Sequence, residues 1–319
     1  AINAYGTSAP SDASASFTPS ENPAARGVFG GGITGGSYDN VNVMQYINIS
    51  SLGNTTDFGD LSIGRKDLSS CSSSTRGIFN GGDSSDTQPV DIIDYITIAN
   101  TGNATDFGNT SVAHKFGASC SSNTRGILVI GDSTGGGYSN AIDYITIASA
   151  GNASDFGNNV AAIAYLAACA STTRGIIGGG YLNANLNSIS YITIGSTGNA
   201  ADFGDLTVAR YYPVGASSNT RGFFSGGNYS GGVSDTIDYI TIASTGNASD
   251  FGNLLEGITA ASATSSPSRG VIAGGQASSL VNTIQYITIA TTGNSTDFGD
   301  LAAARFVGAG CSVAHGGIA

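Results

Sequence analysis

The sequence has 319 residues and is rich in glycine (48), tyrosine (14) and phenylalanine (13), but it has only 11 lysine and arginine residues and a formal net charge of −11. This charge disfavours a sequence-independent grip on nucleic acid, which needs many basic side chains. No apolar stretch reaches the roughly 18 residues of a membrane-spanning helix, so membrane insertion is not expected.

Residues 1–24 are rich in alanine, serine and proline and differ from the rest of the chain. We predict that they form an arm or linker with little structure of its own. From residue 25 to 319 similar segments recur every 47 to 49 residues, which predicts one domain of six units. The units begin near Arg26, Arg76, Arg125, Arg174, Arg221 and Arg269.

Each unit opens with Arg-Gly and a short apolar run closed by glycine, such as RGVFGGG from Arg26. This pattern favours a buried strand that ends in a tight bend. A variable polar loop follows, and then a second strand such as IDYITI from Ile237. Both faces of that strand are partly apolar, so we expect neighbouring sheets to cover it on both sides.

A Thr-Gly-Asn or similar segment then reverses the chain, because glycine and asparagine both accept positive φ. The return strand begins with Asp-Phe-Gly, and a second loop leads into a strand of small residues before the next Arg-Gly. Each unit is therefore predicted to hold four short antiparallel strands. Four such strands at this period are typical of a propeller blade.

At this level the chain resembles the kelch family of β-propellers. The resemblance rests on a glycine pair in five units, on the tyrosine after the variable loop and on a later large aromatic residue. The Phe of Asp-Phe-Gly stands where the family usually has Trp, and the third unit has Ile130–Gly131 in place of the pair. The resemblance implies an all-β, six-bladed kelch-like propeller.

The C-terminal end bears on how such a ring would close. Residues Gly308 to Ala314 begin a seventh copy, and we expect them to supply the small-residue strand of the first blade. The alternative is a fragment cut inside a longer array, in which His315 to Ala319 would start a missing blade.

The segment YITIASTGNASDFG from Tyr239 is also similar to repeats in virion proteins of tailed phages, especially large appendage proteins of marine phages. This resemblance implies a non-catalytic structural or appendage protein of the virion that serves as an assembly or display scaffold. Its partners would be other virion proteins or further copies of itself. An alternative function is a module that binds host-surface glycans.

Four cysteines occupy similar places in their units, and the other two units have Ala216 and Thr264 there. Replacement by small residues favours a packed side chain over a disulfide or a metal ligand. The cysteines are Cys71, Cys120, Cys169 and Cys311.

The Arg-Gly arginines and the Asp-Phe-Gly aspartates occur once in every unit, which favours an architectural role over six equivalent ligand sites. We expect each arginine to bond an aspartate or a turn carbonyl between strands. The aspartates are Asp57, Asp106, Asp155, Asp202, Asp250 and Asp297. The Gly-Asn turns also match the glycosylation sequon at Asn54, Asn103, Asn152, Asn247 and Asn294, but turn chemistry explains these asparagines better.

Strand order places the two variable loops of each unit on one face and the short turns on the other. Variable loops on a rigid scaffold commonly carry binding function. Aromatic and basic residues gather in these loops, which suits a sugar or a protein partner, although loop packing is the alternative. The candidate contact residues are Tyr38, Arg65, Lys66, His114, Lys115, Tyr138, Tyr165, Tyr181, Arg210, Tyr211, Tyr212, Tyr229 and Arg305.

An enzyme is poorly supported by the residues present. The only histidines are His114 and His315, and no His/Cys/Asp set has metal-ligand spacing. We therefore expect no metal, no cofactor and no catalytic residue. A propeller hydrolase or lyase that acts on polysaccharides remains a second alternative, because the many aspartates could supply a pair of carboxyl groups.

Overall fold

The computed structural model describes residues 26–35, 39–85, 88–135 and 137–318. Throughout these residues the chain forms short β-strands joined by turns and loops, and no helix occurs in them. A helix that is long and apolar enough to cross a membrane is accordingly not found in this part of the chain. The expectation of an all-β protein is confirmed. The predicted arm at residues 1–24 lies outside the described residues.

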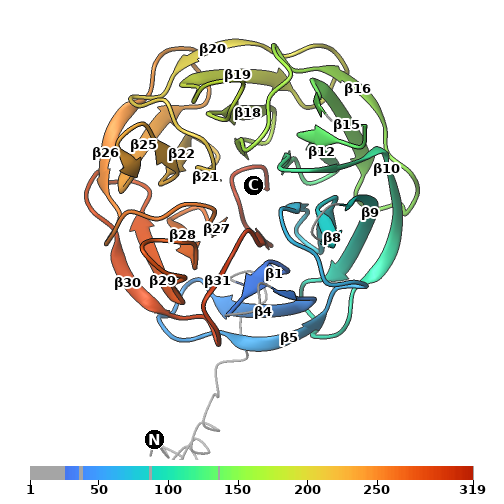
Figure 1. Cartoon of the computed structure of the whole chain (residues 1–319), viewed down its shortest axis with the longest axis horizontal. Helices are drawn as coiled ribbons and strands as arrows, with labels where there is room; N and C mark the ends of the chain where they lie inside the picture. Colours follow the sequence, from blue (N-terminus) through green and yellow to red (C-terminus); the bar gives the residue numbers. More distant parts are fainter. Residues whose placement is uncertain (1–25, 36–38, 86–87, 136, 319) are drawn as a thin grey trace, which may run out of the picture.

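Six sheets share the strand order expected from the repeat: small-residue strand, Arg-Gly strand, tyrosine strand and Asp-Phe-Gly strand, paired antiparallel. Figure 1 shows the sheets arranged around a common centre, and we number them units 1 to 6. In that strand order, unit 1 consists of β32 (Ala309–Ser312), β1 (Arg26–Gly30), β4 (Val43–Asn48) and β5 (Thr56–Asp60), and unit 2 of β6 (Ser69–Ser72), β7 (Arg76–Asn80), β9 (Gln88–Thr97) and β10 (Thr105–Lys115). Unit 3 consists of β11 (Ala118–Ser121), β12 (Arg125–Val129), β15 (Ala141–Thr146) and β16 (Ser154–Asn158), and unit 4 of β17 (Ala167–Ala170), β18 (Arg174–Gly178), β19 (Ser188–Thr193) and β20 (Ala201–Asp205). Unit 5 consists of β21 (Val214–Ser217), β22 (Arg221–Ser225), β25 (Thr236–Thr241) and β26 (Ser249–Asn253), and unit 6 of β27 (Ser262–Ser265), β28 (Arg269–Ala273), β29 (Thr283–Thr288) and β30 (Thr296–Asp300).

The small-residue strand of unit 1 comes from the other end of the chain. Strand β32 pairs antiparallel with β1, with Gly27 opposite Ser312 and Gly30 opposite Ala309. This is the pairing that the partial seventh copy predicts. The six small-residue strands also contact one another in succession, from β6 through β11, β17, β21 and β27 to β32 and back to β6.

The hydrophobic core lies between neighbouring sheets. Phe223, Ile237 and Phe251 of unit 5, for example, form one cluster with Ile272 and Ile287 of unit 6. Because each sheet has a neighbour on both faces, its strands carry apolar residues on both faces, as the pattern of the tyrosine strand predicts.

At the boundary between units, a buried cysteine of one unit packs against the Arg-Gly glycine of the next. Each of the four cysteines is buried and unpaired. A Cβ atom added to Gly126 would lie only 2.9 Å from the Sγ atom of Cys71, and one added to Gly222 only 2.7 Å from that of Cys169. The Arg-Gly glycine thus makes room for a thiol of the preceding unit. The interpretation of the cysteines as packed side chains is confirmed.

The Gly-Asn turns connect adjacent units at the outer edge. In every unit the Oδ1 atom of the turn asparagine accepts a hydrogen bond from a backbone N–H just after Asp-Phe-Gly in the preceding unit, as from Asp60 to Asn103 at 3.0 Å and from Asp300 to Asn54 at 2.9 Å. The asparagine is therefore used twice, once to turn the chain and once to join two units. This supports turn chemistry as the reason for the sequon asparagines.

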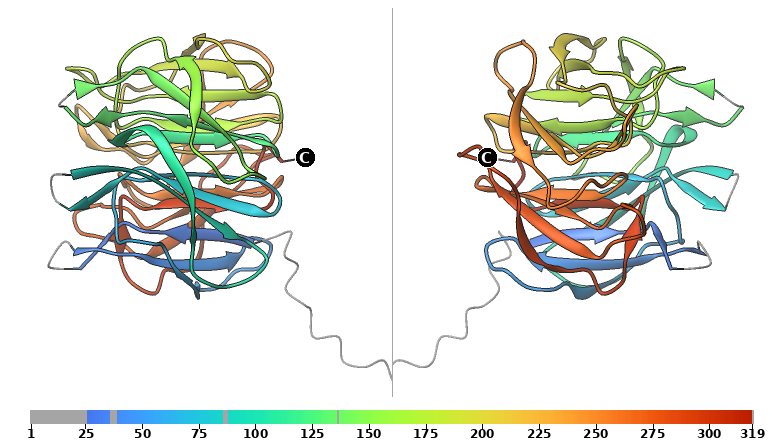
Figure 2. Two further views of the ribbon diagram at one scale, coloured as in Figure 1. Left: turned by 90° about the vertical axis from the view of Figure 1, so that its right-hand side faces the viewer. Right: turned by 60° about the vertical axis from the view of Figure 1, so that its left-hand side comes forward.

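Short hairpins project from one side of the molecule, whereas the C-terminus lies on the other (Figure 2). We call these sides the loop face and the turn face. The additional strands on the loop face are β2 (Ile33–Thr34), β3 (Asp39–Asn40), β8 (Asp83–Ser85), β13 (Asp132–Ser133), β14 (Gly137–Tyr138), β23 (Asn228–Tyr229), β24 (Gly232–Val233) and β31 (Arg305–Phe306).

Candidate functional site

The loops that follow the six Asp-Phe-Gly strands meet at the centre of the loop face. One residue of each loop has φ between 53° and 60°, and its backbone N–H bonds the carbonyl of the corresponding residue in the preceding unit, with N···O distances of 2.7 to 3.3 Å. These six bonds form a complete circuit. We call the six residues the axial ring: Asp67, Phe116, Tyr165, Tyr212, Ala260 and Val307.

The six residues of the axial ring adopt a backbone conformation that is unfavourable for residues other than glycine. Positive φ is uncommon outside glycine, although aspartate tolerates it, and it is exceptional for a β-branched residue such as Val307. Such a conformation persists only where surrounding contacts determine it. The circuit of hydrogen bonds is that determinant, so the side chains at these positions are free to differ between units.

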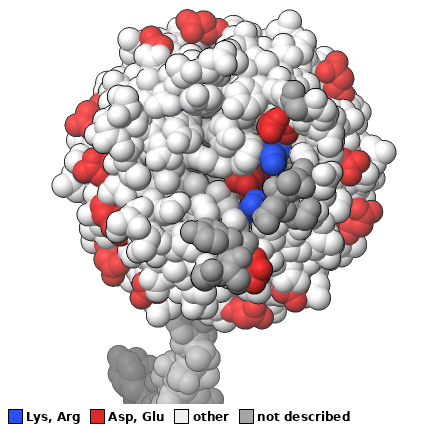
Figure 3. Space-filling view, viewed as in Figure 1, with Lys and Arg blue, Asp and Glu red and all other residues white. Residues whose placement is uncertain are grey.

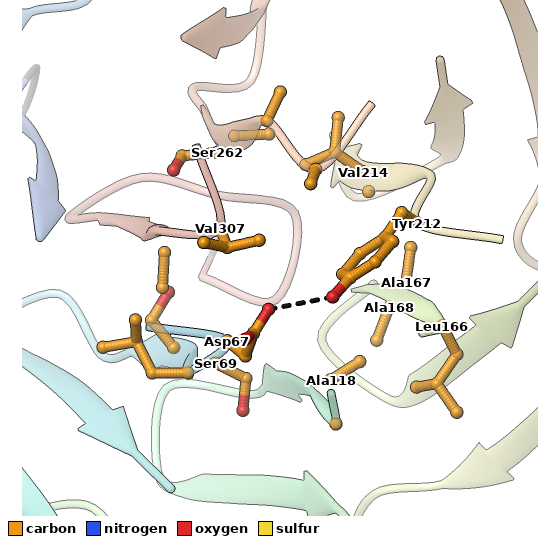
Figure 4. Close-up of a pocket in the computed structure, with 18 of the residues that line it drawn as sticks. Asp67, Ser69, Ala118, Leu166, Ala167, Ala168, Tyr212, Val214, Ser262 and Val307 are labelled. Atoms are coloured by element: carbon orange, nitrogen blue, oxygen red, sulfur yellow. Dashed lines mark hydrogen bonds between the residues drawn. The ribbon is translucent and has the colours of Figure 1, made fainter. Parts of the chain in front are cut away.

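The side chains of the axial ring are distributed unevenly around the axis. Phe116, Tyr165 and Tyr212 come from three successive loops, whereas Ala260 and Val307 are small. Beneath them lies a cavity of about 120 Å³, whose lower wall consists of small residues of the inner strands, including Ser69, Ala118, Ala167 and Ser262 (Figure 4).

A hydrogen bond crosses the mouth of this cavity. The Tyr212 hydroxyl donates to Oδ1 of Asp67 at 2.9 Å, and the two residues are three positions apart in the axial ring (Figure 4). Burial raises the pKa of Asp67 to about 7, and the Tyr212 hydrogen bond and the nearby Lys66 and Lys115 oppose the shift. Burial also raises the pKa of Tyr212, so this phenol remains a donor at neutral pH.

A larger group of rings surrounds the mouth of the cavity. Neighbouring rings contact one another with centroids 4.2 to 6.5 Å apart, and all of them are partly exposed. Tyr181 and Tyr211 are added by two loops of unit 4, which follow β18 and β20, and Tyr138 by β14. We call this group the aromatic patch: Phe116, Tyr138, Tyr165, Tyr181, Tyr211 and Tyr212.

The two lysines of the sequence lie beside this patch, at equivalent positions in successive units. The Nζ atom of Lys115 is 2.9 Å from Oδ2 of Asp83 and 5.2 Å from the centre of the Phe116 ring. Lys66 immediately precedes Asp67 and forms a backbone bridge with Asp83. Basic and acidic atoms accordingly meet at the central hollow, whereas acidic groups lie around the rim of this face (Figure 3).

Four predicted contact residues are buried in the framework, so the prediction that they contact a partner is wrong for this conformation. Arg65 and Arg210 form ion pairs with Asp94 at 2.9 Å and Asp238 at 2.8 Å, with no exposed side-chain surface. The other two are Arg305, which donates to the carbonyls of Gly31 and Val43, and His114, whose pKa burial lowers to about 4. A charged side chain in a loop is drawn inward here because the next unit offers a carboxylate or carbonyl partner.

The remaining predicted residues separate into two groups. Lys66, Lys115, Tyr138, Tyr165, Tyr181, Tyr211 and Tyr212 come together around the cavity. Tyr229 is 38% exposed on the β23–β24 hairpin and makes none of the ring contacts that define the aromatic patch. Tyr38 lies outside the described residues.

The repeated arginines bond carbonyls, one of the two partners expected for them. Each guanidinium lies 4.3 to 4.7 Å from the ring centre of the tyrosine in its own unit. Each also donates to a carbonyl that follows the tyrosine strand of the next unit, as Arg174 does to Ile242 at 2.8 Å and Arg269 to Ile49 at 2.9 Å. The Asp-Phe-Gly aspartates are exposed instead.

Two other hollows are less suited to a specific ligand. A cavity of about 70 Å³ continues the first toward the turn face, where His315 lies against Ser72 and Ser121. A larger, shallow hollow of about 420 Å³ on the turn face is lined by the repeated Ser and Thr turns and by Arg125, which is already engaged with Ile194. In the described residues no group of three or more His, Cys, Asp or Glu side chains could hold a metal ion.

Asp67 is the residue of the site that the sequence patterns do not single out. Alignment of the six loops offers a signal, since it is the one acidic side chain at its repeat position. The sequence matches no protein-family model, and no curated protein is significantly similar to it.

Proposed function

We propose that the chain is a six-bladed kelch-like β-propeller that binds or assembles and does not catalyse. Five four-stranded sheets and one seven-stranded sheet, all with the same order of the four repeat strands, support this fold, together with the pairing of β32 with β1. Three further circuits connect the units: the axial ring, the turn asparagines and the Arg-Gly arginines.

The proposed ligand class for the loop face is carbohydrate. The observation that carries this proposal is the unevenness of the axial ring, because Ala260 and Val307 satisfy the same backbone geometry as Tyr165 and Tyr212. The framework therefore does not need rings at these positions. Partly exposed aromatic faces suit the apolar faces of sugars, and the tyrosine hydroxyls and Lys66 supply polar contacts at the edge.

We place this module in the virion of a tailed phage, as a structural or appendage protein that displays its loop face to host-surface glycans. The similarity of the YITIASTGNASDFG repeat supports that location. Exposed apolar side chains on the loop-face hairpins, among them Tyr229 and Val233, suit contact with another virion protein or a second copy of the chain. Catalysis has less support because desolvation lowers the pKa of both histidines to about 4, and Asp83, near Asp67, is paired with Lys115.

A glycan array followed by titration calorimetry tests the binding proposal. The intact chain should retain a defined set of glycans, and Tyr211→Ala or Tyr181→Ala should weaken binding at least tenfold, since stacked rings dominate such contacts. Tyr229→Ala is the matched control, as an exposed tyrosine outside the aromatic patch. The proposal fails if no glycan is retained or if all three variants bind alike, and glycan turnover would favour the hydrolase or lyase alternative.

A further inference from the structure

The backbone of Asp67 belongs to the axial ring, but its carboxyl group serves neither the hydrogen-bond circuits nor the proposed stacking surface. Asp67 is only 9% exposed, and its carboxylate faces the 120 Å³ cavity (Figure 4). Among the described residues the hydrogen-bond partner of this carboxylate is the neutral hydroxyl of Tyr212, and no ion pair involves it. A buried carboxylate is costly without a counter-charge, so this residue needs an explanation.

The two lysines nearby do not supply that counter-charge by direct contact. Lys115 is bound to Asp83, and Lys66 also has interactions of its own. Both act on Asp67 from a distance, and Asp83 acts in the opposite sense. At the position equivalent to Asp67, the other five units have apolar or aromatic side chains, so the framework does not require an acid there.

The walls of the cavity restrict what could neutralise the carboxylate. Phe116, Tyr165 and Tyr212 line one side, and Ala260 and Val307 line the other. Aromatic rings attract cations through their faces, and organic ammonium ions lose less hydration than metal ions when they enter such a site. A calcium ion would need six to eight oxygen ligands, whereas a single carboxylate is present in the cavity wall.

The volume of the cavity also favours a small organic ion. A protein cavity of roughly 150 Å³ holds one benzene molecule, so a cavity of about 120 Å³ admits a group of similar or smaller size. A trimethylammonium or primary ammonium group meets this limit. A complete sugar ring does not, and would have to remain on the aromatic patch outside.

We propose that the axial cavity is a binding site for a small organic ammonium ion, with Asp67 as its counter-ion and Phe116, Tyr165 and Tyr212 as its aromatic wall. The ammonium site shares Phe116, Tyr165 and Tyr212 with the aromatic patch. Tyr138, Tyr181 and Tyr211 belong to the patch alone. The Tyr212 hydroxyl keeps one carboxylate oxygen of Asp67 occupied and leaves the other for the cation.

Binding of an ammonium ion should depend on pH in a defined direction. The pKa of Asp67 is about 7, and the groups that face it are Tyr212, Tyr165, Lys66, Lys115 and Asp83. The cation favours the ionised carboxylate, so affinity should rise as pH increases through 7 and level off above it. Below pH 7, binding should release a proton from Asp67.

Titration calorimetry of the intact chain with choline chloride at pH 6 and pH 8 tests the proposal, and 3,3-dimethylbutan-1-ol serves as the uncharged isostere. We expect choline to bind, more tightly at pH 8, and the isostere to bind at least tenfold more weakly. Asp67→Asn should weaken choline binding at least tenfold, whereas Asp57→Asn, at an exposed aspartate, should leave it unchanged.

Three results would overturn the site: no choline binding at millimolar concentration, equal binding of choline and its isostere, or unchanged binding to a folded Asp67→Asn variant. If that variant does not fold, the isostere and the pH dependence still decide with the unaltered protein. Since choline carries no sugar, these results are independent of the glycan array.

Discussion

At the scale of single residues, the Arg-Gly arginine is the side chain that most directly joins one unit to the next. Arg174 stacks on Tyr191 of its own unit, with 4.4 Å to the ring centre, and donates to Ile242 of the following unit. A guanidinium can do both because it is planar and presents several donors in fixed directions. The same two contacts recur in all six units, so a local pair becomes a continuous feature of the molecule.

Replacement of Arg174 tests both contacts. Arg174→Ala should lower the free energy of unfolding by about 2 kcal/mol, the sum expected for a partly exposed cation–π contact and a charged hydrogen bond. The free energy of unfolding of Arg174→Lys should lie between those of the original protein and Arg174→Ala, because an ammonium group can reach the carbonyl but is not planar and cannot stack on the ring. Urea denaturation measures the differences. A lysine variant as stable as the original would show that stacking contributes nothing.

At the scale of elements, the loop after an Asp-Phe-Gly strand contacts the tyrosine strand of the next unit through side chains. At two of these contacts the side chains form a buried ion pair, Arg65 with Asp94 and Arg210 with Asp238. In unit 3 and its neighbour the corresponding residues are Ile163 and Ser190, which are also buried. The same two positions are thus occupied by a buried ion pair in some units and by an uncharged pair in another. The uncharged pair, Ile163 with Ser190, can be copied into the position of Arg210 and Asp238 as an experiment.

The pair Arg210 and Asp238 should tolerate double replacement better than single replacement. Arg210→Ile alone should cost about 3 to 5 kcal/mol, since it leaves the Asp238 carboxylate buried without its partner. Adding Asp238→Ser reproduces the Ile163–Ser190 arrangement and should restore most of the loss. Chemical denaturation of the original protein, the two single variants and the double variant gives the coupling energy. Equal stability of the single and double variants would mean that the charge on Asp238 is not the cause.

The contrast between these elements also shows which features could be predicted from sequence. Strand order and the carbonyl contacts of Arg174 belong to every repeat, and a small residue stands at the position of Cys71 in each of them, so the pattern is informative about these features. Arg65 is different, because it opens the charged run Arg65-Lys66-Asp67, which resembles an exposed loop. Its burial depends on Asp94 in the next unit, and the Asp67–Tyr212 bond depends on two loops three units apart.

At the scale of the whole molecule, the hydrogen-bond circuits connect unit 6 to unit 1 in the same way as any other neighbours. Asn54 accepts from Asp300, Arg269 donates to Ile49, and Asp67 donates its backbone N–H to Val307. In an open array of repeats each unit contacts only its neighbours in sequence, and end units can fray. Here the end units have neighbours on both sides, which should make unfolding cooperative.

Removal of β32 tests this cooperativity. A chain that ends at Gly308 would leave β1 without the strand that carries Cys311 and would uncover Val28, both of which belong to a buried cluster. We expect a fall of about 6 °C or more in the unfolding temperature, because roughly 4 kcal/mol or more is lost and a protein of this size shifts by about 1.5 °C per kcal/mol. Removal of residues 314–319 alone keeps β32 and is the matched control. If both truncated chains unfold at the temperature of the intact protein, unit 1 does not depend on β32, and the ring is not what stabilises the molecule.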